Sequence, residues 1–285
     1  MDGTLGNEPA LIEVTRGQRG RSSLAAPFAV PAVLFAVFVL LPLGALVWRA
    51  AGDGDLVQRM TTPFVLNALR LSIITSTATL GLALVLGVPA AYLLARTRFP
   101  GHHFVTVLVE LPMVLPPTVA GVGLLVAFGR RGIFGEWLSD AGLEVPFTTT
   151  AVVLAQLFVA APFLVRTMQA GFESIDPTYE RVSATLGVSA WRTFWRVTLP
   201  LARPALVSGA VLCWTRALSE LGATIIFAGN FEGRTQTMPL AIISALESRA
   251  GLEGAIALSV ILLAVALVLL VAMRLVLRRP LGADA

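Results

Sequence analysis

Long apolar stretches, separated by short polar connections, run along most of the chain. Six of them are long enough to cross a bilayer as a helix, which takes about 20 mostly apolar residues. The predicted spans are Pro27–Trp48, Phe64–Ala95, Phe104–Phe128, Thr148–Gly171, Leu201–Ala228 and Gly254–Val276. The pattern therefore predicts an all-α membrane protein with six transmembrane helices.

Composition supports burial in a membrane and restricts the possible chemistry. Hydrophobic residues make up 56% of the chain and charged residues 13%, whereas a soluble domain has about 25% charged residues. All of the 21 Lys and Arg residues are arginines. Without lysine the chain can form neither a P-loop, whose lysine reaches the phosphates, nor a Schiff base. If ATP is the fuel, a separate subunit must bind the ATP and magnesium, and we expect no cofactor in this chain.

Arginine placement predicts the orientation of the helices. With the N-terminus inside, the cytoplasmic side holds about twice as many arginines as the outer side, in agreement with the positive-inside rule. Both termini then lie in the cytoplasm, with residues 1–26 and 280–285 as tails of a transmembrane domain at 27–279. The connection 129–147 is then external, and the longer connection 172–200 is internal.

The internal connection has the pattern of two short helices. Asp176 is a good N-cap for the first, and Gly187 permits the left-handed turn that ends it. Tyr179, Val182 and Leu186 fall on one face of this helix at helical spacing.

The second short helix is capped by Ser189 and presents an aromatic face made of Trp191, Phe194 and Trp195. Two interpretations fit such a helical pair. It is either an amphipathic hairpin lying on lipid or a compact knob that fits a groove on a soluble partner.

The spacing of this connection resembles a known signature. Gly187, followed at fixed distance by Val197 and Leu199-Pro200, is similar to the signature loop of permeases in bacterial ABC importers. In that family the loop is the coupling helix, which docks on the nucleotide-binding subunit. The signature normally opens with Glu-Ala-Ala, which is here Arg181-Val182-Ser183, and Glu180 lies one position earlier. The ATPase-coupling residues implied by the resemblance are Tyr179, Glu180, Val182, Ala184, Leu186, Gly187, Trp191 and Phe194.

Three further segments extend the resemblance to one branch of that family. Residues 111–117 look like the third-span motif of molybdate permeases, and residues 216–224 are similar to their fifth-span motif. Residues 228–242 resemble the loop that follows, and their Thr-Gln-Thr-x-Pro-Leu run favours molybdate or tungstate. Sulfate permeases are near relatives, so sulfate or thiosulfate import is the alternative.

The resemblance implies the fold, the location and the partners. It implies a type I ABC importer permease with a cytoplasmic coupling helix, in a bacterial inner membrane. The chain contains no convincing internal repeat, so a second copy in a homodimer supplies the other half of the pore. The other implied partners are two copies of an ABC ATPase and an extracytoplasmic oxyanion-binding protein, with no nucleic acid.

Ionisable residues and prolines inside the spans mark a candidate translocation path. Arg216 and Glu220 are four residues apart on one helix face, so they can pair, either as a structural lock or beside an oxyanion pathway. Prolines remove backbone donors and break a helix where it faces protein or a water cavity. The candidate path residues are Pro112, Pro116, Pro117, Arg216, Ser219, Glu220, Gly222 and Thr224. The candidate outer docking residues are Asn230, Arg234, Thr235, Gln236 and Thr237.

Two rival functions find little support in the sequence. An intramembrane protease needs a catalytic constellation at membrane depth, but no histidine lies in a predicted span and no HExxH motif occurs. The lone Cys213 and the adjacent pair His102 and His103 do not form a metal site. A solitary ion-coupled carrier usually shows inverted repeats and buried acidic sites near the midplane. We therefore expect a transport subunit without catalytic residues.

Overall fold

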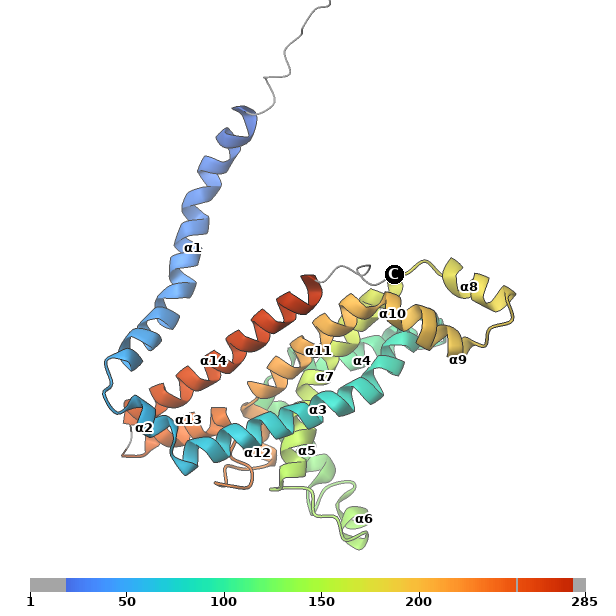
Figure 1. Cartoon of the computed structure of the whole chain (residues 1–285). Helices are drawn as coiled ribbons and strands as arrows, with labels where there is room; N and C mark the ends of the chain where they lie inside the picture. Colours follow the sequence, from blue (N-terminus) through green and yellow to red (C-terminus); the bar gives the residue numbers. More distant parts are fainter. Residues whose placement is uncertain (1–18, 250, 279–285) are drawn as a thin grey trace, which may run out of the picture. The chain divides into compact units, whose positions relative to one another are not determined.

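The computed structural model describes residues 19–249 and 251–278, and every regular element in that part of the chain is helical. The chain divides into two compact units, residues 1–52 and 53–285 (Figure 1). The first unit contains a single described helix, α1 (Arg19–Ala51), whose segment Phe28–Ala51 is long and apolar enough to span a membrane. This helix begins before the predicted span, and the rest of the predicted N-terminal tail lies outside the described residues.

The second unit is built around three helices that pack side by side. They are α3 (Pro63–Arg96), α7 (Thr149–Glu173) and α11 (Arg203–Leu218), and their interface buries small and medium apolar side chains such as Ala83, Leu164 and Met168. The last helix, α14 (Gly251–Arg278), packs against α11 and against α13 (Met238–Glu247). The predicted C-terminal tail lies outside the described residues.

The number of long apolar helices agrees with the predicted number of spans. Four helices of the described residues can each cross a membrane alone, and two bent helix pairs raise the possible number to six. One bent pair is α4 (His102–Val114) with α5 (Pro117–Phe128), which meet at an angle of 116°. The other joins Ala190–Leu201 to α11 at 76°. The all-α membrane fold is therefore confirmed.

The predicted third and fifth spans are not continuous helices. Leu115 adopts an extended conformation before Pro116, as expected because a proline disfavours the helical region at the preceding residue. The fifth span stops at Leu218, and a short helix, α12 (Gly222–Phe227), follows after the break. The remaining short helices are α2 (Leu56–Met60) and α6 (Gly135–Asp140).

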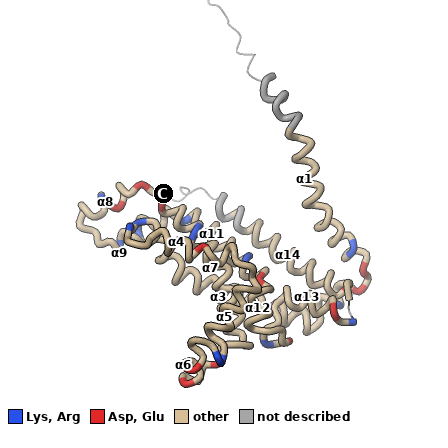
Figure 2. Tube along the Cα trace, turned by 180° about the vertical axis from the view of Figure 1, so that it is seen from behind, with Lys and Arg blue, Asp and Glu red and all other residues tan. Residues whose placement is uncertain are grey.

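The connection between α7 and α11 folds as a compact segment, which we call the knob (residues 175–201). It contains α8 (Thr178–Thr185), α9 (Ala190–Thr193), the π-helix η1 (Phe194–Thr198) and α10 (Leu199–Leu201). Figure 1 shows the knob at the end of the second unit where α3 ends and α11 begins. In Figure 2 charged residues gather mainly towards the ends of this unit, whereas the middle of the helical bundle is largely uncharged.

Candidate functional site

Local hydrogen bonding sets the two ends of helix α8 in the knob. Asp176 Oδ1 accepts a hydrogen bond of 2.8 Å from the amide of Thr178. Hydrogen bonding to the side chain and the amide of Thr178 lowers the pKa of the Asp176 carboxyl. Gly187 has a φ of +74°, which is the predicted left-handed turn after the helix. The first short helix is therefore close to its predicted place, with Pro177 rather than Asp176 at the N-cap position, and the second begins after Ser189 as predicted but continues through η1 and α10 to Leu201.

One face of α8 is apolar and exposed. Tyr179, Val182 and Leu186 are exposed by 56%, 52% and 76%. Ala184 and Gly187 are exposed as well, although Ala184, four residues after Glu180, lies on a different side of the helix. Such a cluster is unusual for a water-facing surface, because contiguous exposed apolar patches mark interaction sites.

The side chain of Glu180 is directed away from this exposed face and joins the knob to the bundle. Its Oε1 lies 3.2 Å from Arg96 Nε and accepts a hydrogen bond of 3.0 Å from the hydroxyl of Thr198. Arg96 Nη2 also donates to the carbonyl of Ile175 at 3.1 Å. Arg96, at the C-terminal end of α3, thus connects the bundle to the start of the knob and to α8, and Glu180 connects α8 to η1.

Phe194 is also directed inwards. It is 9% exposed, and its ring lies 5.0 Å from that of Tyr92 and 6.1 Å from that of Phe172, measured between centroids. Its neighbours Trp191 and Trp195 remain exposed by 71% and 51%. The predicted aromatic face is therefore divided: Phe194 anchors the knob in the bundle core, and the two indoles remain at the surface.

In the middle of the second unit, the two helix breaks pack against each other. A methyl group placed on Gly222 would lie 2.8 Å from Pro117 Cβ, and one on Gly121 would lie 2.9 Å from the carbonyl oxygen of Ala223. Only glycine allows such an approach. The proline-rich segment and the start of α12, which the sequence assigned separately to a path, are thus brought together.

Arg216 and Glu220 form the predicted ion pair. Arg216 Nη1 lies 2.7 Å from Glu220 Oε2, and the glutamate side chain is only 1% exposed. Glu220 Oε1 also accepts a hydrogen bond of 2.9 Å from the amide of Ala223, in the first turn of α12. One carboxylate therefore neutralises a cation on α11 and caps the helix on the far side of the break. Its arginine partner is 26% exposed, so it can still act on an anion nearby.

The other predicted path residues differ in accessibility. Ser219 and Pro116 are exposed, whereas Pro112 and Pro117 are half-buried. Thr224 is buried, and its hydroxyl has no hydrogen-bond partner among the described residues. Of the two predicted path residues with a hydroxyl group, Ser219 is thus the exposed one.

The predicted docking loop between α12 and α13 is held together from within. Gln236 Nε2 donates to Asn230 Oδ1 at 2.9 Å and to Ser244 Oγ at 3.0 Å. Thr235, Gln236 and Thr237 are all buried. Of the five predicted docking residues, only Arg234 is exposed, next to the exposed ring of Phe231.

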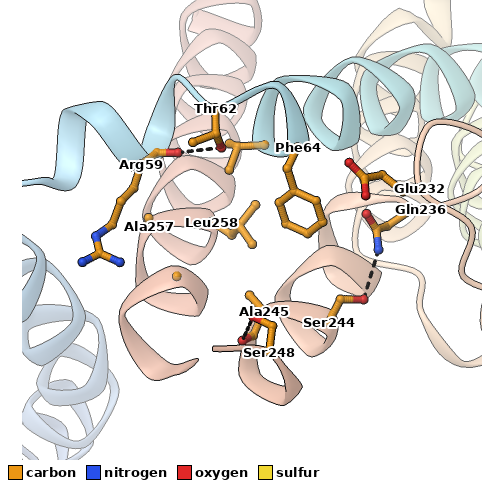
Figure 3. A pocket seen from close by; sticks show the side chains of 12 residues that line it. Arg59, Thr62, Phe64, Glu232, Gln236, Ser244, Ala245, Ser248, Ala257 and Leu258 are labelled. Carbon is orange, nitrogen blue, oxygen red and sulfur yellow. Dashed lines mark hydrogen bonds between the residues drawn. The ribbon is translucent and has the colours of Figure 1, made fainter. Parts of the chain in front are cut away.

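A cavity of about 570 Å³ opens beside this loop, between α2, α3, α13 and α14 (Figure 3). Apolar side chains such as Phe64 and Leu258 line it, together with Glu232 and Gln236. Arg59 is on its rim, but its guanidinium is directed away from Phe64 and Leu258 in Figure 3 and is paired with Asp53 at 3.3 Å and Glu253 at 2.9 Å. The cavity therefore offers no unneutralised cation to an oxyanion.

Sequence reasoning did not identify two polar networks. Arg96 contributed only to the predicted orientation of the helices, because no pattern of neighbouring residues connects it to Glu180 in the knob. The second is the contact of Thr75 and Thr79 on α3 with the amide of Gln156 on α7, at 3.2 and 3.1 Å. The spacing of the two threonines on one helix face is the signal that could have revealed it. Among the described residues, no cluster of three or more His, Cys, Asp and Glu residues could hold a metal ion.

Comparison with known proteins places these features in context. Residues 83–281 match the family described as binding-protein-dependent transport system inner membrane component. The chain is 43% identical to the molybdenum transport system permease protein ModB of Mycobacterium tuberculosis, over 90% of this chain and 95% of that protein. It is 36% identical to the sulfate transport system permease protein CysT of Escherichia coli, over 82% of this chain and 85% of that protein.

A solved structure has the same fold at lower sequence identity. A chain of a bacterial alginate ABC transporter, crystallised in complex with an alginate pentasaccharide-bound periplasmic protein, aligns with a TM-score of 0.72 and 18% identity. The alignment covers 91% of this chain and 96% of that chain. The predicted type I ABC importer permease fold is therefore confirmed.

Proposed function

The chain belongs to the family of binding-protein-dependent transport system inner membrane components, and from this premise we propose that it is the permease subunit of an ATP-driven importer of molybdate or tungstate. The protein is a pore-forming membrane component and not an enzyme. The observation that carries the proposal is the 43% identity to a molybdenum permease over nearly the whole length of both chains. The lower identity to a sulfate permease makes sulfate or thiosulfate import the second candidate.

The proposed ATPase contact is the exposed apolar face of α8. Tyr179, Val182 and Leu186 supply a surface that a groove on a soluble subunit can cover, a common mode of helix recognition. Two ATPase copies, which bind the ATP and magnesium, clamp the knobs of a permease homodimer. Glu180 and Phe194 serve this contact indirectly, because their partners lie within the permease and hold α8 in position.

The proposed path runs beside the two packed helix breaks. A tetrahedral dianion is stabilised by hydrogen-bond donors and positive charge, but a site that bound it too tightly would not release it. Arg216 is paired with Glu220 but remains 26% exposed, so its attraction for an anion at low dielectric is moderate, and the hydroxyl of Ser219 lies at the same break. Movement of the knobs on ATP binding switches the bundle between inward-facing and outward-facing states.

The proposed orientation has the knob and both termini in the cytoplasm, as the distribution of arginines favours. The loop with Arg234 and Phe231 then faces outwards, and we assign it to docking of the oxyanion-binding protein. The buried residues Thr235, Gln236 and Thr237 support the shape of this loop by their packing and hydrogen bonds.

Two measurements test the proposal. Co-purification of the permease with its proposed ATPase partner, and loss of that association in Leu186→Asp, test the coupling face. Calorimetric titration of the cognate binding protein with molybdate, tungstate and sulfate tests the cargo. We expect tight binding of the first two anions. Tight binding of sulfate without binding of molybdate would establish the second candidate instead.

A further inference from the structure

An apolar groove lies between helix α3 and the second half of the knob. Its volume is about 620 Å³, and only apolar and aromatic side chains line it. Val85 and Leu93 contribute from α3, and Trp191 and Trp195 contribute from the knob. The volume is within the range of small-molecule pockets, about 300–1,000 Å³. The groove is therefore large enough for a flexible apolar chain, and the only polar side-chain groups of its lining residues are the hydroxyl of Tyr92 and the indole N–H groups of the two tryptophans.

The position of the groove along α3 corresponds to the membrane interface. It covers the last apolar turns of the helix, and α3 ends at Arg96, about 5 Å beyond Leu93 at 1.5 Å per residue. Val85 is 70% exposed, as expected for a side chain that faces lipid. Trp191 and Trp195 are exposed beside it, and tryptophan is enriched where acyl chains meet headgroups.

The charge around the groove is positive. Arg192 and Arg196 directly follow the two tryptophans, are exposed, and form no salt bridge with any described residue. No acidic residue occurs between Val188 and Ser219. The acidic residue of the adjoining helix, Glu180, is already paired with Arg96. Arg192 and Arg196 do not line the groove, but each is one residue beyond a tryptophan that does, so both are close in sequence to its mouth and carry charge that no described carboxylate neutralises in a salt bridge.

We propose that this groove binds one acyl chain of an anionic phospholipid, with the phosphate held by Arg192 and Arg196. The two faces of the knob then have different partners: the α8 face meets the ATPase, and the Trp191–Trp195 face meets lipid. The bound chain touches Phe194, whose ring packs on Tyr92 in the bundle core. Lipid binding therefore stabilises the packing of Phe194 on Tyr92, which holds the knob against the bundle. The proposal is independent of the oxyanion carried.

The test is a lipid titration of the delipidated full-length permease–ATPase complex, read by native mass spectrometry. The probes are dioleoyl phosphatidylglycerol and dioleoyl phosphatidylcholine, which share acyl chains and differ in headgroup charge. We expect the anionic lipid to bind more tightly to the wild-type complex. Val85→Phe should lower the affinity for both lipids, because the larger side chain fills the groove. Leu86→Phe changes the neighbouring exposed residue, which is outside the groove, and should lower neither affinity.

A second variant tests the headgroup without changing the packing. Arg192→Gln with Arg196→Gln should remove the preference for phosphatidylglycerol, with a loss of about fivefold in affinity per arginine, since a basic residue near an anionic surface is worth about 1 kcal/mol. The control is Arg130→Gln with Arg131→Gln, which removes two exposed charges elsewhere. Equal affinity of the wild-type complex for the two lipids would overturn the proposal. Lipid binding that Val85→Phe leaves unchanged would also overturn it, and this is the result expected if a second copy of the chain fills the groove.

Discussion

Breaking the ion pair between Arg96 and Glu180 should weaken the attachment of the knob to the bundle without unfolding the knob. The guanidinium and the carboxylate are 3.2 Å apart, with side-chain exposures of 12% and 21%. At an effective dielectric constant of about 20, this distance corresponds to a gross attraction of about 5 kcal/mol, part of which offsets desolvation. An exposed pair contributes at most about 1 kcal/mol, and breaking a fully buried one costs about 3–5 kcal/mol. We therefore expect a coupling free energy of about 1–2 kcal/mol for this half-buried pair.

A double-mutant cycle isolates that coupling. Glu180→Gln retains the side-chain oxygen that accepts the Thr198 hydrogen bond but removes the charge, and Arg96→Gln removes the other partner. The free energy of unfolding of the purified complex is measured for the wild type, the two single variants and the double variant. The same variants are assayed for anion uptake per ATP hydrolysed, which should fall because ATPase movement is transmitted less directly to α3.

The matched control is the pair Arg130 and Glu144. Its atoms are closer, at 2.8 Å, but its side chains are 77% and 64% exposed. Its cycle should give a coupling free energy of about 0–1 kcal/mol and no change in the transport ratio. Strict additivity of Arg96→Gln and Glu180→Gln, or a coupling no larger than that of the control, would refute the claim that this pair holds the knob.

Three further predictions concern the packed helix breaks and the exposed face of α8. Glu220→Ala should destabilise the protein by about 1–3 kcal/mol in thermal unfolding, because it leaves the buried amide of Ala223 without its acceptor and the partly exposed Arg216 without its partner, and anion uptake should be lost; normal uptake would contradict a role in the path. Gly222→Ala should cost about 1–3 kcal/mol through overpacking against the neighbouring proline, whereas Gly81→Ala, with no atom within 4 Å, should be neutral or stabilising in the same assay. Leu186→Asp should abolish co-purification of the ATPase with an unchanged melting temperature, and retained association would exclude the α8 face as the contact.

Much of the fold follows from local patterns. Apolar length alone predicted the helices, because a span must satisfy its backbone hydrogen bonds internally. Gly187 marked the turn of the knob because few other residues adopt its positive φ, and spacing on one helix predicted the pair of Arg216 with Glu220. In each case the physical cause acts between residues that are close in sequence.

The features that the sequence did not predict depend on contacts between residues that are far apart in the chain. The partner of Glu180 is on a helix that ends 84 residues earlier in the chain, so no pattern within the loop identifies Arg96. Prolines predicted a break near Leu115 but not the angle of 116°, which depends on how α5 packs against α12. The polar run Thr235–Thr237 reads as an exposed loop, yet its side chains are buried against the bundle.

As the proposed permease of an ATP-driven molybdate importer, this chain should form the pore only together with its partners. The most direct measurement is molybdate uptake into proteoliposomes containing the permease and its ATPase, with the binding protein outside and ATP inside. We predict uptake that requires all three proteins and ATP, that tungstate inhibits, and that excess sulfate leaves largely unchanged. Uptake by the permease alone, or uptake of sulfate in place of molybdate by the complete system, would contradict the account.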